Sequence, residues 1–145
     1  MFVRFITICA LLGAVGCGPF VLLPGGKLDG ATVPAPSDWS FSREVDTVQL
    51  ETRPEDPYSV NIWAVEIGPA LYVHAGTNKS QWVENMLADA KVRVRIEDDI
   101  YDLSASRVTT QAEFDRFSDK YEQKYDRRPG NENVAEAYVF RLVAR

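Results

Sequence analysis

The chain has 145 residues, a formal net charge of −5, two cysteines and a single histidine. Nucleic acids and anionic membrane surfaces carry negative charge, so an acidic chain is not expected to bind either of them through its own charge. Once the N-terminal segment discussed next is set aside, the length suffices for one domain and is too short for two with proper cores.

Residues 1–16 have the pattern of a signal peptide, with an early positive charge, an uncharged apolar run and small residues before Cys17. The segment around Cys17 resembles a bacterial lipobox, although Ala14 stands where such boxes usually carry Leu. The resemblance implies cleavage after Gly16, a diacylglycerol thioether on the Cys17 sulfur and an acylated new N-terminus. The alternatives are an ordinary secretory peptide and a short membrane anchor.

The lipobox interpretation predicts a lipid-anchored protein of the cell envelope. In a Gram-negative cell it predicts the outer membrane, facing the periplasm, because Gly18 rather than Asp follows the cysteine. Cys9 lies in the discarded segment and Cys17 would carry lipid, so the mature domain must fold without disulfides.

Residues 17–38 are rich in proline and glycine, a composition that opposes both helix and central strand. We predict that they form a tether and that residues 39–145 form the domain. The apolar residues 20–23 lie against the bilayer or pack on the domain as an extra edge strand, and the pattern leaves both alternatives open.

Short strands and two helices follow. Alternating and β-rich runs predict strands over residues 47–52, 60–67, 71–74, 92–96, 100–108 and 138–143, with turns at Gly68-Pro69 and Asp98-Asp99. This order predicts a mostly β chain of the α+β class, with an antiparallel sheet that curls into a six-stranded barrel.

The two helices are predicted from their apolar periodicity. Residues 80–88 place four apolar side chains on one face, with Asn78 or Ser80 as N-cap: Trp82, Val83, Met86 and Leu87. The second helix starts at Thr109 or Thr110 and carries an aromatic stripe of Phe114, Phe117, Tyr121 and Tyr125. We expect this stripe to cover one barrel opening.

Three segments, 58–63, 71–76 and 80–94, resemble consecutive parts of the pyridoxamine 5'-phosphate oxidase-like split β-barrel family of flavin and deazaflavin proteins. The resemblance implies a flavin-reductase-like barrel, a homodimer with FMN or a deazaflavin between two barrels, and electron transfer of the nitro- or quinone-reductase type. The cofactor would supply the chemistry and the protein the pocket.

The resemblance also implies a cofactor site where the loop 76–80 meets the first helix. Its expected residues are Asn61, His74, Lys79, Ser80, Trp82 and Asn85, and no catalytic residue is assigned. Many flavin-dependent members have Ser-x-Lys at this helix start, whereas this chain has Ser80-Gln81-Trp82. A tryptophan there is closer to the deazaflavin nitroreductase branch.

Each candidate also has a structural interpretation. A lone His74 excludes a histidine metal cluster, so no metal is predicted, and the ring can instead end a strand at the surface. Trp63 and Trp82 either stack on a cofactor or fill the barrel, and the core is favoured. The cations of residues 91–95 line a groove or, as we favour, face solvent. The alternative function is a non-catalytic lipoprotein that uses the barrel to bind another ligand or a protein.

Overall fold

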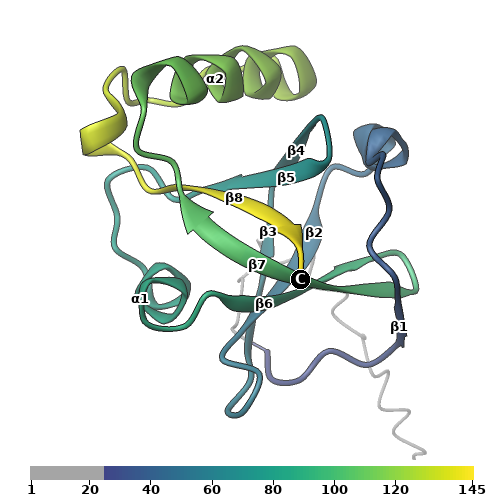
Figure 1. Ribbon diagram of the computed structural model, residues 1–145. Coiled ribbons are helices and arrows are strands. Elements are labelled where there is room, and N and C mark those ends of the chain that lie inside the picture. The colour runs from purple at the N-terminus through teal and green to yellow at the C-terminus, as the bar shows by residue number, and fades with distance from the viewer. Residues whose placement is uncertain (1–24) are drawn as a thin grey trace, which may run out of the picture.

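The computed structural model describes residues 25–145, so the predicted signal peptide (1–16) and the predicted lipidation site Cys17 lie outside the described residues. The described part forms a curled sheet with two α-helices and two short 3-10 helices (Figure 1). The elements in chain order are β1 (Ala31–Val33), η1 (Ser40–Glu44), β2 (Val48–Thr52), β3 (Tyr58–Ile62), β4 (Ala64–Ile67), β5 (Ala70–His74), α1 (Gln81–Ala88), β6 (Lys91–Ile96), β7 (Asp99–Arg107), α2 (Gln111–Tyr125), η2 (Val134–Glu136) and β8 (Val139–Ala144).

One bent segment supplies both ends of the sheet. The strand order is β3-β2-β6-β7-β8-β5-β4, and β3 and β4 are consecutive in the chain, separated only by Trp63. The first half pairs with β2 and the second half with β5, both antiparallel, so the sheet curls back to the segment on which it began. The predicted strand 60–67 is therefore this bent segment, and the predicted mostly β, six-stranded antiparallel split barrel is confirmed. β1 is an addition to it.

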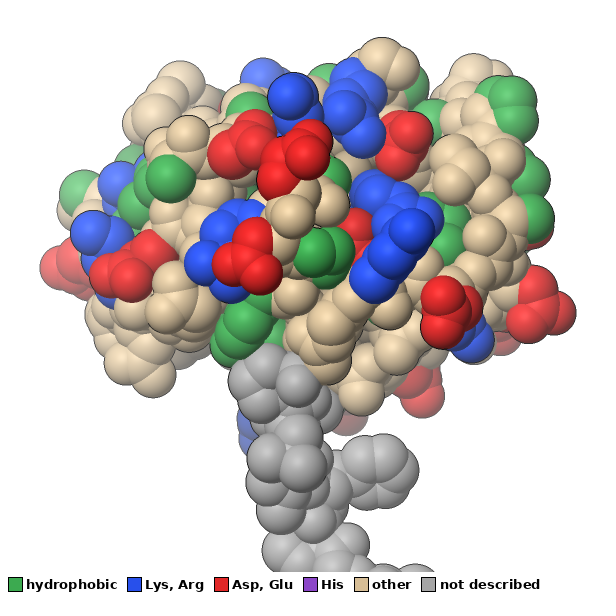
Figure 2. Space-filling model, turned by 90° about the horizontal axis from the view of Figure 1, so that it is seen from below, with side chains coloured by type: hydrophobic (Ala, Val, Ile, Leu, Met, Phe, Trp, Pro, Cys, Tyr) green, Lys and Arg blue, Asp and Glu red, His purple; other side chains and the backbone are tan. Residues whose placement is uncertain are grey.

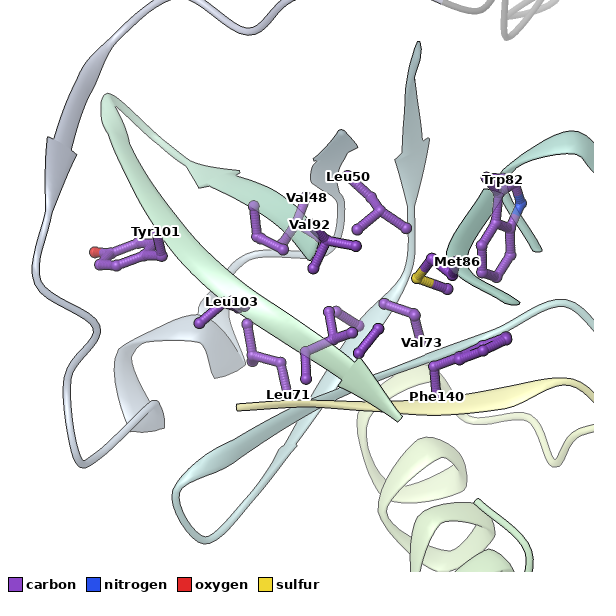
Figure 3. Close-up of a cluster of buried hydrophobic side chains, with 14 of the residues drawn as sticks. Val48, Leu50, Leu71, Val73, Trp82, Met86, Val92, Tyr101, Leu103 and Phe140 are labelled. Carbon is purple, nitrogen blue, oxygen red and sulfur yellow. The ribbon is translucent and has the colours of Figure 1, made fainter. Parts of the chain in front are cut away.

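The inward-facing residues of the strands form the main core, as their alternation requires. Figure 3 shows their side chains meeting inside the barrel, with Trp82 and Met86 of α1 closing in from one side. At the other side the fully buried Trp39, which precedes η1, packs edge-to-face on Tyr101 with 4.9 Å between ring centroids. Leu87, predicted to join the buried face of α1, is instead exposed, since the inward stripe passes through Asn85.

Helix α2 lies on the outer face of the sheet, which corrects the expectation that it covers a barrel opening (Figure 1). Its aromatic stripe packs on side chains that point out of the barrel from three strands: Val65, Ala70, Tyr72 and Val139. The stripe itself was predicted correctly, because Phe114 and Phe117 are fully buried. The helix ends at Tyr125, and the C-cap residue Asp126 adopts a left-handed conformation with φ of 53°.

Residues 25–33 form what we call the N-terminal strap, which crosses four neighbouring strands. Gly25 exchanges two backbone hydrogen bonds with Ser59 of β3, at 2.8 and 2.9 Å. The backbone N–H of the buried Leu28 donates to Glu51 of β2, and Arg95 of β6 donates to the carbonyl of Asp29. β1 then pairs with β7 in parallel. This part of the predicted tether thus packs on the barrel.

None of the helices among residues 25–145 combines the length and the apolar composition needed to cross a bilayer.

Candidate functional site

Helix α1 begins with a serine that does not cap it. Ser80 has the extended backbone of an N-cap residue, and its carbonyl accepts hydrogen bonds from Val83 and Glu84 at 3.0 and 3.1 Å. Its side chain makes no capping bond, and the Oγ atom is buried without a partner. Serine normally satisfies one of the free N–H groups of a first helical turn. Here those donors, with the positive end of the helix dipole, are left for another acceptor.

The loop before α1 contains a glycine in a left-handed conformation and an exposed cation. Gly76 has φ of 59°, in the left-handed region that glycine adopts at little cost. Lys79 is exposed one residue before Ser80. A helix start beside a lysine favours a phosphate or carboxylate.

A second cation, Arg107, stands beside the same loop. Its register partner is Phe140, so the two side chains lie on one face of the sheet, the face that continues into the barrel interior. The guanidinium lies 4.6 Å from the centroid of the Tyr138 ring and donates to the carbonyl of Ala137 at 3.3 Å. Tyr138 in turn donates its backbone N–H to the carbonyl of Gly76 at 2.9 Å. Sequence reasoning missed Arg107, although its spacing from Leu103 places it on the inward-facing side of a strand.

Asn85 holds α1 on the barrel. Its amide nitrogen donates to Thr52 Oγ1 at 2.9 Å, and its oxygen accepts from the Gln81 amide at 3.0 Å. The hydroxyl of Thr52 donates onward to the carbonyl of Tyr58 at 3.2 Å. These bonds occupy the buried side chain of Asn85 and give it a positioning role.

Neither the side chain of Asn61 nor that of Trp82 is placed to contact a ligand at the start of α1. Asn61 is exposed on β3 opposite Gln49, whereas α1 attaches at Thr52, at the other end of the same strand pair. Trp82 is only 8% exposed and packs on Phe140, so little of its ring is open to a cofactor.

His74 lies on the opposite side of the sheet from Trp82. Because side chains alternate along β5, His74 points toward α2, where its ring meets Phe117 and Tyr121 at centroid distances of 5.6 and 5.8 Å. Burial lowers the pKa of His74, and a contact with the Asn131 side chain partly opposes this shift. Of the six predicted site residues, Lys79 and Ser80 remain together at the start of α1, with Arg107 as a new neighbour of their loop.

A buried ion pair lies under the N-terminal strap. The Glu51 side chain is fully buried, and its carboxylate accepts from Arg93 at 3.0 Å and from the backbone of Leu28. Arg93 also lies 3.8 Å from Asp102. The expectation that the cations of this strand face solvent holds for Lys91 but is wrong for Arg93, which is paired with the buried Glu51. Arg95 is partly buried and donates to the carbonyl of Asp29 in the strap. Among residues 25–145 no cluster of three histidine, cysteine or carboxylate side chains is arranged to hold a metal.

Solved structures of several other proteins share this fold. The chain is 16% identical to a protein of Listeria innocua assigned as a pyridoxamine 5'-phosphate oxidase, with a TM-score of 0.54, covering 68% of this chain and 82% of that one. It is 16% identical to an FAD-binding protein of Mesorhizobium loti, with a TM-score of 0.54 and coverage of 71% and 83%. It is 18% identical to HutZ, the heme storage protein of Vibrio cholerae, with a TM-score of 0.57 and coverage of 72% and 85%. These likenesses show the split-barrel fold.

A further structure with this fold, described as a domain-swapped dimer, is 18% identical, with a TM-score of 0.55 and coverage of 68% and 80%. A search of curated proteins finds no match to the chain. Residues 42–140 match the model of a family described as "Uncharacterized protein conserved in bacteria (DUF2255)".

Proposed function

Because the chain belongs to the bacterial DUF2255 family and has a split-barrel fold, we propose that it is a lipid-anchored envelope protein whose barrel binds a phosphate-bearing flavin or deazaflavin. The observation that carries the cofactor proposal is the uncapped start of α1, with Ser80 Oγ unpartnered beside Lys79. When bound, such a cofactor would supply hydride or electron transfer, of the nitro- or quinone-reductase type that the family resemblance implies.

The residues present fit the phosphate end of such a cofactor. The free N–H groups of α1, the Ser80 hydroxyl and Lys79 are donors of the kind that hold a phosphate, and Arg107 adds a second positive charge at the neighbouring strand end. The FAD-binding relative makes a flavin the first ligand to test.

The residues of one copy fit the ring end less well, since Trp82 is buried in the core. A second copy of the chain would supply the missing wall, and this is our reason for proposing a homodimer with the cofactor between two barrels. The dimeric relative supports this choice.

Titration of the purified chain, with Cys17→Ser and without residues 1–16, tests the cofactor proposal. FMN and a deazaflavin are each added while flavin and tryptophan fluorescence are followed, and hemin is titrated in parallel because one relative is a heme storage protein. Lys79→Ala and Arg107→Ala should each weaken flavin binding by about tenfold, as expected for the loss of a charge-assisted contact. Arg116→Ala, an exposed cation on α2, is the matched control and should leave the affinity unchanged.

The outcomes separate the alternatives. If a flavin binds but Lys79→Ala and Arg107→Ala do not change its affinity, the proposed site is wrong and the proposed cofactor is retained. If neither flavin binds at high micromolar concentration, the cofactor proposal fails and the non-catalytic interpretation replaces it. The burial of Trp82 and His74 favours that interpretation. If hemin binds tightly and neither flavin binds, the proposed cofactor becomes heme.

The anchor is tested separately in cells. Cys17→Ser removes the sulfur that would carry the thioether, so the chain should move from the membrane fraction to the soluble fraction and should no longer incorporate radiolabelled palmitate. Palmitate labelling that persists in Cys17→Ser would contradict the lipobox interpretation.

A further inference from the structure

We infer that the surface around Gly25 and the β2–β3 turn (residues 53–57) faces the lipid bilayer, and that α2 faces away from it. This inference rests on the proposed lipidation of Cys17. Lipidation alone would attach the domain to the membrane in any orientation, whereas here one face of the barrel lies toward the bilayer and the opposite face lies toward the aqueous phase.

The strap fixes where the anchoring segment leaves the domain. Gly25 is held to Ser59 by two backbone hydrogen bonds, and Leu28 is buried against the barrel three residues later. The chain therefore enters the fold at β3, next to the β2–β3 turn, on the side of the molecule away from α2 (Figure 1).

The reach of the chain limits the orientations that are open to the domain. From Cys17 to Gly25 the backbone can span at most about 28 Å. A domain of this size is about 35 Å across. To lay α2 on the bilayer, the domain would have to raise Gly25 by nearly its full diameter, and the chain is too short for that.

The chemistry of this face suits proximity to lipid without insertion. Figure 2 shows Lys and Arg side chains interspersed with Asp and Glu over the face seen from below, with hydrophobic side chains scattered among them. Mixed charges give such a face little attraction of its own for anionic lipid. The bilayer is then held near it by the lipid chains on Cys17, whose combined burial gives stable anchoring.

Energy transfer from single labels tests this placement. The chain has only Cys9 and Cys17, so Glu55→Cys in the β2–β3 turn or Arg116→Cys on α2 adds one reactive thiol to the domain. The mature lipidated protein, which has lost Cys9 with residues 1–16 and carries a donor dye at either position, is reconstituted into vesicles with an acceptor on the lipid headgroups. Transfer from position 55 should exceed that from position 116 by about twofold or more, because the two labels lie on opposite sides of the domain.

A second form separates placement from lipidation. In it, residues 1–16 are removed and six histidines replace residues 17–22, so nickel-chelating lipids hold the chain no farther from Gly25 than a lipid on Cys17 would. Equal transfer from both positions in this form, or stronger transfer from position 116, would overturn the placement alone. Loss of the unaltered chain from cell membranes would overturn the proposed anchor, and the natural placement with it.

Discussion

Neutralising Glu51 should be one of the more damaging conservative changes in this fold. Its carboxylate is fully buried under the strap and is bound to Arg93, whose side chain is 14% exposed. Glu51→Gln keeps an acceptor for the Leu28 N–H, so the change removes the charge while the shape is retained. Arg93 is then left with Asp102, at 3.8 Å, as its charged neighbour.

Leaving one partner of a buried ion pair without the other typically costs about 3–5 kcal/mol. For a domain of this length, that loss corresponds to a melting temperature lower by roughly 10–25 °C. Chemical denaturation of Glu51→Gln, Arg93→Gln and the double variant measures it. The double variant should cost less than the sum of the two single variants by about 1–3 kcal/mol, because the second change removes a charge that the first has already left unpaired.

The pair between Arg128 and Asp119 is the matched control. Both side chains are at least half exposed, so water screens their attraction, and Asp119→Asn should leave the melting temperature unchanged. The reasoning would fail if Glu51→Gln changed the free energy of unfolding by less than about 1 kcal/mol, or if the two single changes were additive.

Two further predictions concern the contact between α2 and the sheet. Phe117→Ala should lower the free energy of unfolding by about 3–5 kcal/mol, because the ring is fully buried, whereas the exposed Arg116→Ala should not; an unchanged melting temperature for Phe117→Ala would contradict the packing of α2. Since burial lowers the pKa of His74 below its ordinary 6.5, the unfolded chain binds a proton that the folded chain resists, so stability should fall as pH drops below about 6.5. His74→Gln should flatten that part of the stability profile, and a slope that persists in His74→Gln would assign it to other groups.

The periodicity of the sequence was sufficient for the strands and helices that carry most of the core. Alternation over 92–96 and 100–108 and the aromatic stripe of α2 each follow from burial on one face, and the structure confirms them. The bend at Trp63 was not visible, because apolar residues continue without a break from β3 into β4 and only the change of pairing partner separates the two strands.

Which of the predicted site residues lie together depends on the side of the sheet to which each strand residue points. Leu71 and Val73 face the barrel interior while His74 faces α2, so a histidine close in sequence to the loop at α1 lies on the other side of the sheet from Trp82. The burial of Glu51 could not be predicted either, since the alternation of residues 47–52 places it on the outer face of the strand. It is the strap, whose composition gives no strand signal, that covers it.

The bent segment β3–β4 also bears on how copies of the protein behave when they are crowded. Unpaired strand edges recruit strands from neighbouring molecules, and long flat edges do so most readily. Here the two ends of the sheet are strands of five and four residues, set at an angle by the bend at Trp63, and Gly25 occupies part of the outer edge of β3. For a chain concentrated on a membrane surface, as we propose, this geometry would keep neighbouring barrels from joining edge to edge.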